Sequence, residues 1–189
     1  MEDFLVSVSS VAIAEMGDRT QLLSLMLAAR FRQPWPILAG VFFATLANHA
    51  AAGAIGVAFG SFLTPSLLDG AVGFSMVAMA LWTLKPDTLD GDTKLRGTGA
   101  FLATLIAFFI AEIGDKTQIA TVALAAAYSN LVSVVAGTTL GMMAANVPVV
   151  FLGNAFADRL PLKLLNRIAA ALFMIIGIVF LARAVEHWK

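Results

Sequence analysis

Long apolar runs separated by short polar connections dominate the chain. A membrane-crossing helix needs about 20 apolar residues. In hydrocarbon every backbone donor and acceptor must be satisfied within the segment, and no alternation over about ten residues indicates a β-barrel. The pattern therefore predicts an all-α integral membrane protein with six transmembrane helices. The six runs cover residues 4–29, 36–59, 67–84, 98–127, 131–153 and 164–185.

One long polar segment, residues 85–97, divides the chain. It lies between the third and fourth apolar runs and carries Lys85, Lys94 and Arg96. We therefore expect two halves of three helices each, residues 1–84 and 98–189, joined by this loop.

The basic residues predict the orientation in the membrane, because loops rich in Lys and Arg stay in the cytoplasm. The connections after spans one, three and five carry eight basic residues, whereas those after spans two and four carry none. The loop at 85–97 is therefore expected in the cytoplasm, and both termini in the periplasm of a bacterial inner membrane. The eight residues are Arg30, Arg32, Lys85, Lys94, Arg96, Arg159, Lys163 and Arg167.

The amino-acid composition indicates the surroundings of the protein and limits the kinds of ligand that it can bind. Hydrophobic residues make up 60% of the 189, charged residues 13%, and the mean hydropathy is +0.89. Soluble domains have about 45–50% apolar residues, so lipid is the expected surroundings. The absence of cysteine excludes thiolate metal sites, so a bound ion must be held mainly by oxygen. The zero net charge gives no basic surface for nucleic acid. No cofactor is expected, and the pattern is compatible with a homo-oligomer.

A ten-residue motif occurs twice. Residues 13–22 read IAEMGDRTQL and residues 110–119 read IAEIGDKTQI, with seven identical positions at an offset of 97. Because each half has three crossings, an odd number, the second copy crosses the membrane in the opposite sense. The chain is therefore predicted to form two inverted three-helix repeats, an architecture typical of secondary transporters whose sites lie near the membrane midplane.

The motif places four carboxylates well inside apolar spans. A charge there costs at least about 2.5–3.5 kcal/mol on insertion scales, so these acids call for a compensating function. Glu and Asp three residues apart share one face of a helix, and the glycine between them can loosen it and turn a carbonyl inward. Such oxygen donors suit a hard divalent cation. The candidate ligands are Glu15, Asp18, Glu112 and Asp115, with Thr20, Gln21, Thr117 and Gln118 as neutral donors.

A purely structural interpretation competes with the metal site. Glu15 and Arg19, like Glu112 and Lys116, are four residues apart, so each pair could neutralise itself on its own helix. That pairing leaves the two aspartates of the motifs without partners. Four acids and two bases leave two negative charges, which match one divalent cation or two protons.

Three further polar residues lie in apolar spans. Asn48 and Asn146 occupy nearly equivalent places at an offset of 98, and each side-chain carbonyl is either a ligand or an interhelical hydrogen-bonding group. His49 is a candidate manganese ligand or proton relay, although a lone histidine is more often hydrogen-bonded inside a bundle.

At these motifs the sequence resembles the Gdt-type calcium and manganese transporters of bacteria, plastids and the Golgi. Their hallmark is Glu-x-Gly-Asp-(Lys/Arg)-(Thr/Ser) in both halves, which reads here EMGDRT at 15–20 and EIGDKT at 112–117. The resemblance extends over essentially the whole chain. It implies exchange of Mn²⁺ or Ca²⁺ for protons, with the four motif acids forming the site.

The expected function is therefore a secondary transporter that exchanges a divalent cation for protons, with Mn²⁺ efflux favoured over Ca²⁺ transport. Clustered carboxylates in a low-dielectric site cannot all stay ionised without a cation, so protons replace a departing metal. The alternatives are a passive divalent-cation channel and an exporter of small organic cations or amino acids. An enzyme is not expected, because no Ser/His pair or Cys nucleophile occurs in the spans.

Overall fold

A computed structural model describes residues 1–84, 99–128, 130–152 and 162–187. All regular elements in these ranges are helices. The predicted polar loop at 85–97 lies outside the described residues, as does residue 153 at the end of the fifth predicted span.

Four helices are long and apolar enough to cross a membrane, judged by length and composition. They are α3 (Pro34–Phe62), α4 (Pro65–Thr83), α7 (Leu131–Leu152) and α9 (Leu162–Glu186). In α9 the apolar part is Asn166–Glu186. Both α3 and α4 begin with proline. The amide groups of the first helical turn have no acceptor within the helix, so the missing N–H of proline costs nothing there. All four helices coincide with predicted spans to within a few residues.

The first and fourth predicted spans are each broken into two shorter helices. The prediction of one continuous helix across each motif was wrong, because three residues in the middle of each motif leave the helical conformation. A hydropathy pattern does not reveal so short a break inside an apolar run. The resulting helices are α1 (Glu2–Glu15), α2 (Arg19–Phe31), α5 (Ala100–Glu112) and α6 (Lys116–Ala127).

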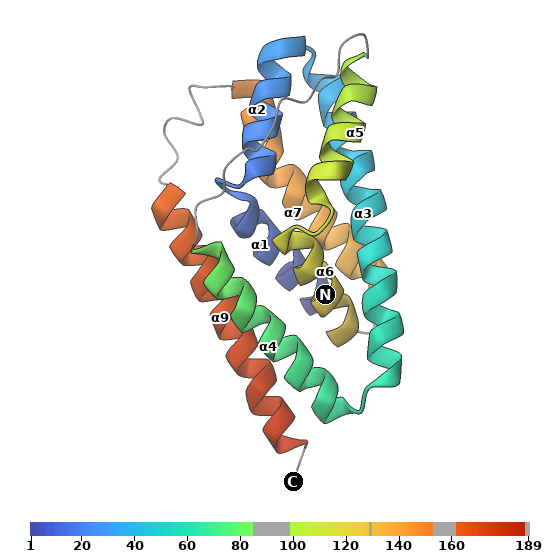
Figure 1. Ribbon diagram of the computed structural model, residues 1–189, viewed down its shortest axis with the longest axis vertical. Coiled ribbons are helices and arrows are strands. Elements are labelled where there is room, and N and C mark those ends of the chain that lie inside the picture. The colour runs from blue at the N-terminus through green and yellow to red at the C-terminus, as the bar shows by residue number, and fades with distance from the viewer. Residues whose placement is uncertain (85–98, 129, 153–161, 188–189) are drawn as a thin grey trace.

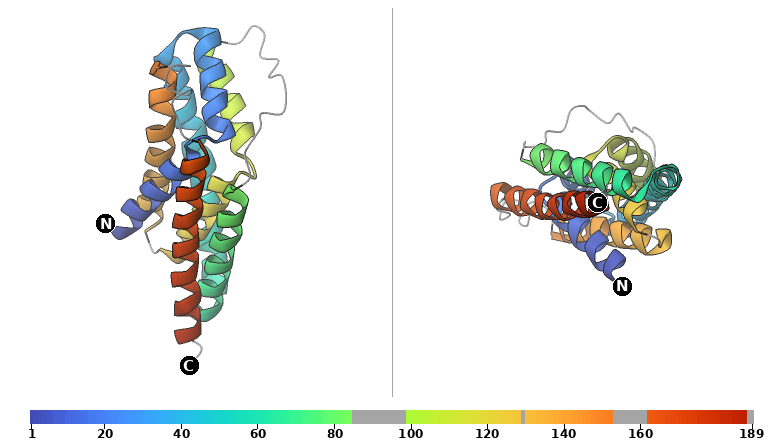
Figure 2. Two further views of the ribbon diagram at one scale, coloured as in Figure 1. Left: turned by 90° about the vertical axis from the view of Figure 1, so that its left-hand side faces the viewer. Right: turned by 90° about the horizontal axis from the view of Figure 1, so that it is seen from below.

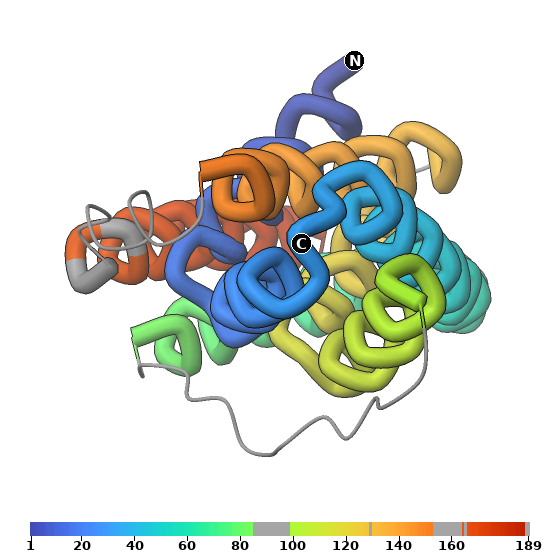
Figure 3. Tube along the Cα trace, turned by 90° about the horizontal axis from the view of Figure 1, so that it is seen from above, coloured from blue at the N-terminus to red at the C-terminus, as the bar shows by residue number. Residues whose placement is uncertain are grey.

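The two broken helices run in opposite directions and meet at their breaks (Figure 1). From its break α2 leads toward the top of the view, whereas α5 descends from the top to its own break. Helix α1 packs on α7, and α5 packs on α3. Helices α4 and α9 lie side by side on one flank and contact α6 and α1, respectively (Figure 2). Seen from above, the near ends of α4 and α9 lie to one side of α2, and both helices run from there beneath the bundle toward the middle of the view (Figure 3).

Matching contacts relate the two halves. A methyl group on Gly40 of α3 would lie 2.8 Å from the carbonyl oxygen of Phe101 and 2.7 Å from Cβ of Thr104. A methyl group on Gly137 of α7 would lie 2.8 Å from the carbonyl oxygen of Phe4 and 2.7 Å from Cβ of Ser7. Gly40 and Gly137 are 97 residues apart, which is the offset of the motif. The residues that they contact are related in the same way, Phe101 to Phe4 and Thr104 to Ser7. Each long helix therefore packs closely against the broken helix of the other half.

Apolar side chains fill the bundle and also cover its surface. One buried cluster includes Met76 of α4 and Phe173 of α9, and another includes Val41 of α3 and Phe108 of α5. On the outside of α9, Ile175 and other large aliphatic side chains are mostly exposed. An exposed apolar surface around a bundle that buries charged groups is typical of a protein surrounded by lipid.

Candidate metal site between the two broken helices

The two breaks have the same backbone conformation. After Glu15 the chain is extended at Met16, reaches φ +87° at Gly17 and is extended again at Asp18. In the second motif Gly114 has φ +74° between two extended residues. A positive φ is readily accessible to glycine and strained for other residues, so the glycine of each motif permits the break.

A glutamine side chain holds each break in place. The amide N–H of Gly17 donates to Oε1 of Gln21 at 2.8 Å, and that of Gly114 donates to Oε1 of Gln118 at 2.7 Å. Gln21 also donates through Nε2 to the carbonyl oxygen of Ala145, at 3.0 Å. The two glutamines were predicted as neutral ligands of the ion, but their carbonyl oxygens here accept backbone hydrogen bonds.

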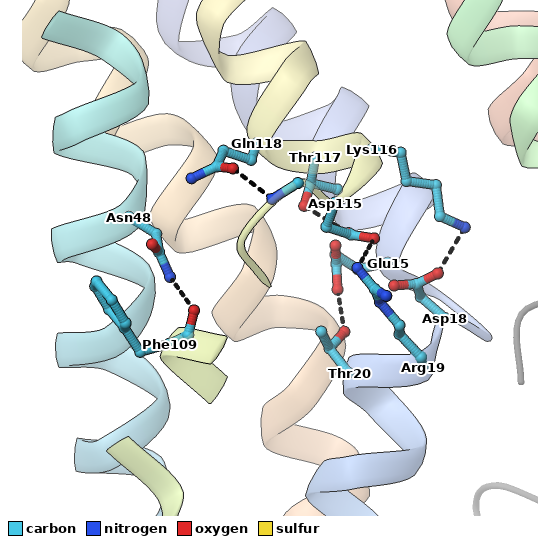
Figure 4. A network of polar contacts seen from close by, with 11 residues as sticks. Glu15, Asp18, Arg19, Thr20, Asn48, Phe109, Asp115, Lys116, Thr117 and Gln118 are labelled. Atoms are coloured by element: carbon cyan, nitrogen blue, oxygen red, sulfur yellow. Dashed lines mark hydrogen bonds and ion pairs between the residues drawn. The ribbon is translucent and has the colours of Figure 1, made fainter. Parts of the chain in front are cut away.

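Three of the four motif carboxylates converge. Glu15 ends α1, while Asp18 and Asp115 immediately precede α2 and α6. One carboxylate oxygen from each lies within 4.8 Å of the other two, and all three residues are at most 2% exposed. The positive end of a helix dipole favours negative charge at Asp18 and Asp115. Figure 4 shows these groups facing one another from the two breaks.

Two ion pairs cross between the motifs. Arg19 approaches Oδ1 of Asp115 with one guanidinium nitrogen, at 2.8 Å, and Nζ of Lys116 lies 2.6 Å from Oδ1 of Asp18. The alternative in which each basic residue neutralises the glutamate of its own helix assumed a continuous helix. The breaks remove that geometry, and the bases pair instead with the two aspartates that this alternative left without partners.

Threonine hydroxyls bind the clustered carboxylates. The Thr20 hydroxyl donates to Oε2 of Glu15, and Thr117 donates to Oδ2 of Asp115 at 3.2 Å. The other glutamate oxygen, Oε1 of Glu15, is buried without a hydrogen-bond partner among the described residues. A buried acceptor left without a partner costs about 1–3 kcal/mol, so a cation at this atom would relieve that cost.

The fourth motif acid lies beside this cluster but is not one of the three whose oxygens converge. Glu112 accepts hydrogen bonds from the Thr45 hydroxyl and, at 3.1 Å, from Nδ2 of Asn48, both on α3. Of the four acids predicted to share one site, the structure therefore brings three together. Asn48 was predicted to offer its carbonyl oxygen, but its amide nitrogen holds Glu112. Thr45 was not among the predicted residues, although it lies three residues before Asn48 on the same face of the helix.

The two asparagines, which the sequence paired, have different surroundings. Oδ1 of Asn146 accepts a hydrogen bond from Ser24 at 2.6 Å, and its Nδ2 donates to the carbonyl oxygen of Met142 at 3.0 Å. An offset of 98 rather than 97 turns a helical side chain by about 100° relative to its counterpart. Asn146 therefore contacts α2 rather than the carboxylates.

His49 is fully buried beside Asn48 in the sequence. Neither of its ring nitrogens has a hydrogen-bond partner within the described ranges. The expectation that a lone histidine would be hydrogen-bonded inside the bundle is not met here.

Comparison with known proteins identifies the repeat. A family model described as "Divalent cation/proton antiporter GDT1" matches residues 3–91 and again residues 100–188, so each match contains one motif. A Vibrio cholerae protein named "Putative manganese exporter" is 50% identical over 179 residues, covering 94% of this chain and 90% of its own length. "GDT1-like protein sll0615" of Synechocystis is 29% identical, over 93% of this chain and 95% of the relative. No solved structure matches.

Proposed function

Given that this chain belongs to the GDT1 family of divalent cation/proton antiporters, we propose that it exports Mn²⁺ from a bacterial cytoplasm in exchange for protons. The observation that carries the proposal is the convergence of three buried carboxylates, Glu15, Asp18 and Asp115, at two breaks that face each other. Ca²⁺ is the second candidate substrate.

The chemistry of the cluster suits such a cargo. Carboxylate oxygens are the ligands that Mg²⁺, Ca²⁺ and Mn²⁺ prefer. Oε1 of Glu15 has no other partner among the described residues, so it is available to an ion. The threonines Thr20 and Thr117 orient two of the carboxylates rather than serving as ligands themselves. Gln21, Gln118 and Asn146 are left out of the proposed ligand set, because their side-chain oxygens accept other hydrogen bonds. Asn48 is left out because its amide nitrogen holds Glu112.

Charge balance supports exchange with protons. Four motif carboxylates and two basic side chains leave two negative charges, counting Glu112 beside the cluster. One divalent cation or two protons restore neutrality. Because a low-dielectric site cannot hold uncompensated charge, metal and protons bind alternately to the same region.

The proposed architecture is six spans in two inverted three-helix repeats. The first repeat has α1 and α2 as one broken span, followed by α3 and α4, and the second has α5 and α6 as the other, followed by α7 and α9. Broken helices that meet at the middle of the membrane are typical of secondary transporters, in which one part of the bundle rocks against another around a fixed site. By the distribution of basic residues, the N- and C-termini lie in the periplasm of the inner membrane.

Reconstituted protein tests the proposal. We expect liposomes with an acidic interior to take up external Mn²⁺, while the interior becomes more alkaline as protons leave. Collapsing the pH gradient with a protonophore should reduce uptake to the rate of protein-free liposomes. A Mn²⁺-sensitive dye and a pH-sensitive dye in the lumen measure the two movements, and Ca²⁺ in place of Mn²⁺ gives the preference.

Uptake that persists without a gradient or proton movement would instead indicate a passive channel. If neither ion moves in response to the gradient, the proposal of exchange is rejected.

A further inference from the structure

The two cations at the carboxylate cluster have unequal surroundings. The Lys116 side chain is 2% exposed and its partner Asp18 is fully buried, whereas the Arg19 side chain is 33% exposed. The pairs are equivalent by sequence, since both bases follow the aspartate of their motif. One end of the cluster is therefore closed by a fully buried lysine, and the other by an arginine whose side chain is partly exposed.

The ion pair between Arg19 and Asp115 also has a geometry that is easily broken. One terminal nitrogen bonds Oδ1 of Asp115, and Nε has no hydrogen-bond partner among the described residues. A guanidinium group holds a carboxylate most firmly through two parallel hydrogen bonds, so a single bond is the weaker arrangement. The Arg19 side chain is already partly exposed, so leaving Asp115 moves it away from the interior rather than through it.

Lys116 has no comparable route. Separating a buried ammonium from its carboxylate leaves two charges in a low-dielectric interior, which costs several kcal/mol. An ion that enters the cluster therefore displaces Arg19 rather than Lys116. Counting only the three acids of the cluster with Lys116 and Arg19, the departure of Arg19 changes the charge from one negative to two. With Glu112 beside them protonated, one divalent cation then restores neutrality.

We propose that Arg19 is a tethered competitor of the transported cation. It binds Asp115, and the entering metal ion displaces it toward the exposed side of the cluster. Arg19 thus lowers the affinity for metal and keeps the empty site compensated in charge. This role rests on the proposed function, because it requires that the cluster bind a metal ion.

The absence of cysteine from the chain allows a test on one protein preparation. The variant Arg19→Cys carries a single thiol, which 2-aminoethyl methanethiosulfonate converts to a cationic side chain and methyl methanethiosulfonate to a neutral one. Titration of the full chain in detergent with Mn²⁺, followed by calorimetry, gives the dissociation constant of each adduct. A partly exposed ion pair contributes up to about 1 kcal/mol, so we expect the neutral adduct to bind Mn²⁺ about fivefold more tightly than the cationic one.

A pair of ordinary substitutions repeats the test if the cysteine variant does not fold. Arg19→Lys should keep the affinity of the wild-type chain, and Arg19→Gln should bind Mn²⁺ more tightly. A purely structural role for Arg19 predicts the reverse, because loss of its contact would disorder the site.

The outcomes separate this inference from the proposed function. Equal binding by the two adducts, or weaker binding by the neutral one, would overturn the role of Arg19 and leave the metal site intact. Absence of Mn²⁺ binding to the wild-type chain would overturn the proposed function, and the role of Arg19 with it.

Discussion

Asp18→Asn and Asp115→Asn are each expected to abolish proton-coupled Mn²⁺ movement while the protein still inserts in the membrane. Each change removes one of three converging carboxylates and one negative charge, with almost no change in volume. Mutating a residue that only orients a metal ligand lowers the affinity for the metal by about 10- to 100-fold. Loss of a ligand itself should therefore lower it by at least about 100-fold. The measurement is the rate of Mn²⁺ uptake into liposomes with an acidic interior.

A matched control is available in α4. Asp69 is also a buried aspartate with a basic neighbour, since its Oδ2 lies 3.0 Å from Nδ1 of His187, but it lies outside the carboxylate cluster. Asp69→Asn should therefore transport at close to the wild-type rate. Normal transport by Asp18→Asn or Asp115→Asn would refute the assignment of that residue as a ligand.

Lys116→Met is expected to cause the largest loss of stability in the site. The substitution leaves Asp18 buried without its ammonium partner, and breaking a buried ion pair in this way costs about 3–5 kcal/mol. Arg19→Met also leaves a buried carboxylate, Asp115, without its cation, but it should cost less because the Arg19 side chain is partly exposed. Thermal unfolding in detergent, followed by tryptophan fluorescence, compares the two variants.

The double variant Asp18→Asn/Lys116→Met tests whether the loss comes from the uncompensated carboxylate. Removing both charges should recover most of the stability that Lys116→Met loses, as expected for coupled neighbours. If the double variant is as unstable as the sum of the single changes, the ion pair across the two motifs does not contribute to folding as described.

The sequence predicted the membrane class, four of the helices and the residues at the centre of the molecule, because these depend on local composition and on a repeated motif. Gly17 and Gly114 also indicated where a helix could loosen. The sequence did not reveal that each helix stops there completely, because a break of three residues scarcely changes the hydropathy of a long apolar run. A positive φ held by a glutamine four residues later is a property of the folded backbone.

For a related reason, the sequence did not show which charged side chains would pair with each other. The expected pairing of Glu15 with Arg19 depended on the spacing of one turn in an intact helix. With the helix broken, Arg19 meets an aspartate 96 residues away. Similarly, the interaction of Glu112 with Thr45 and Asn48 depends on how α5 packs on α3. Repetition in the sequence indicated which residues matter, but not which of them meet.

The location of the bound ion tests the central claim most directly. Crystals of the wild-type protein grown with Mn²⁺ and measured at the manganese absorption edge would reveal it by anomalous scattering. We predict one peak between the breaks, with an oxygen of Glu15, Asp18 and Asp115 each within about 2.0–2.6 Å. A peak elsewhere in the bundle with none between these three carboxylates would contradict the account.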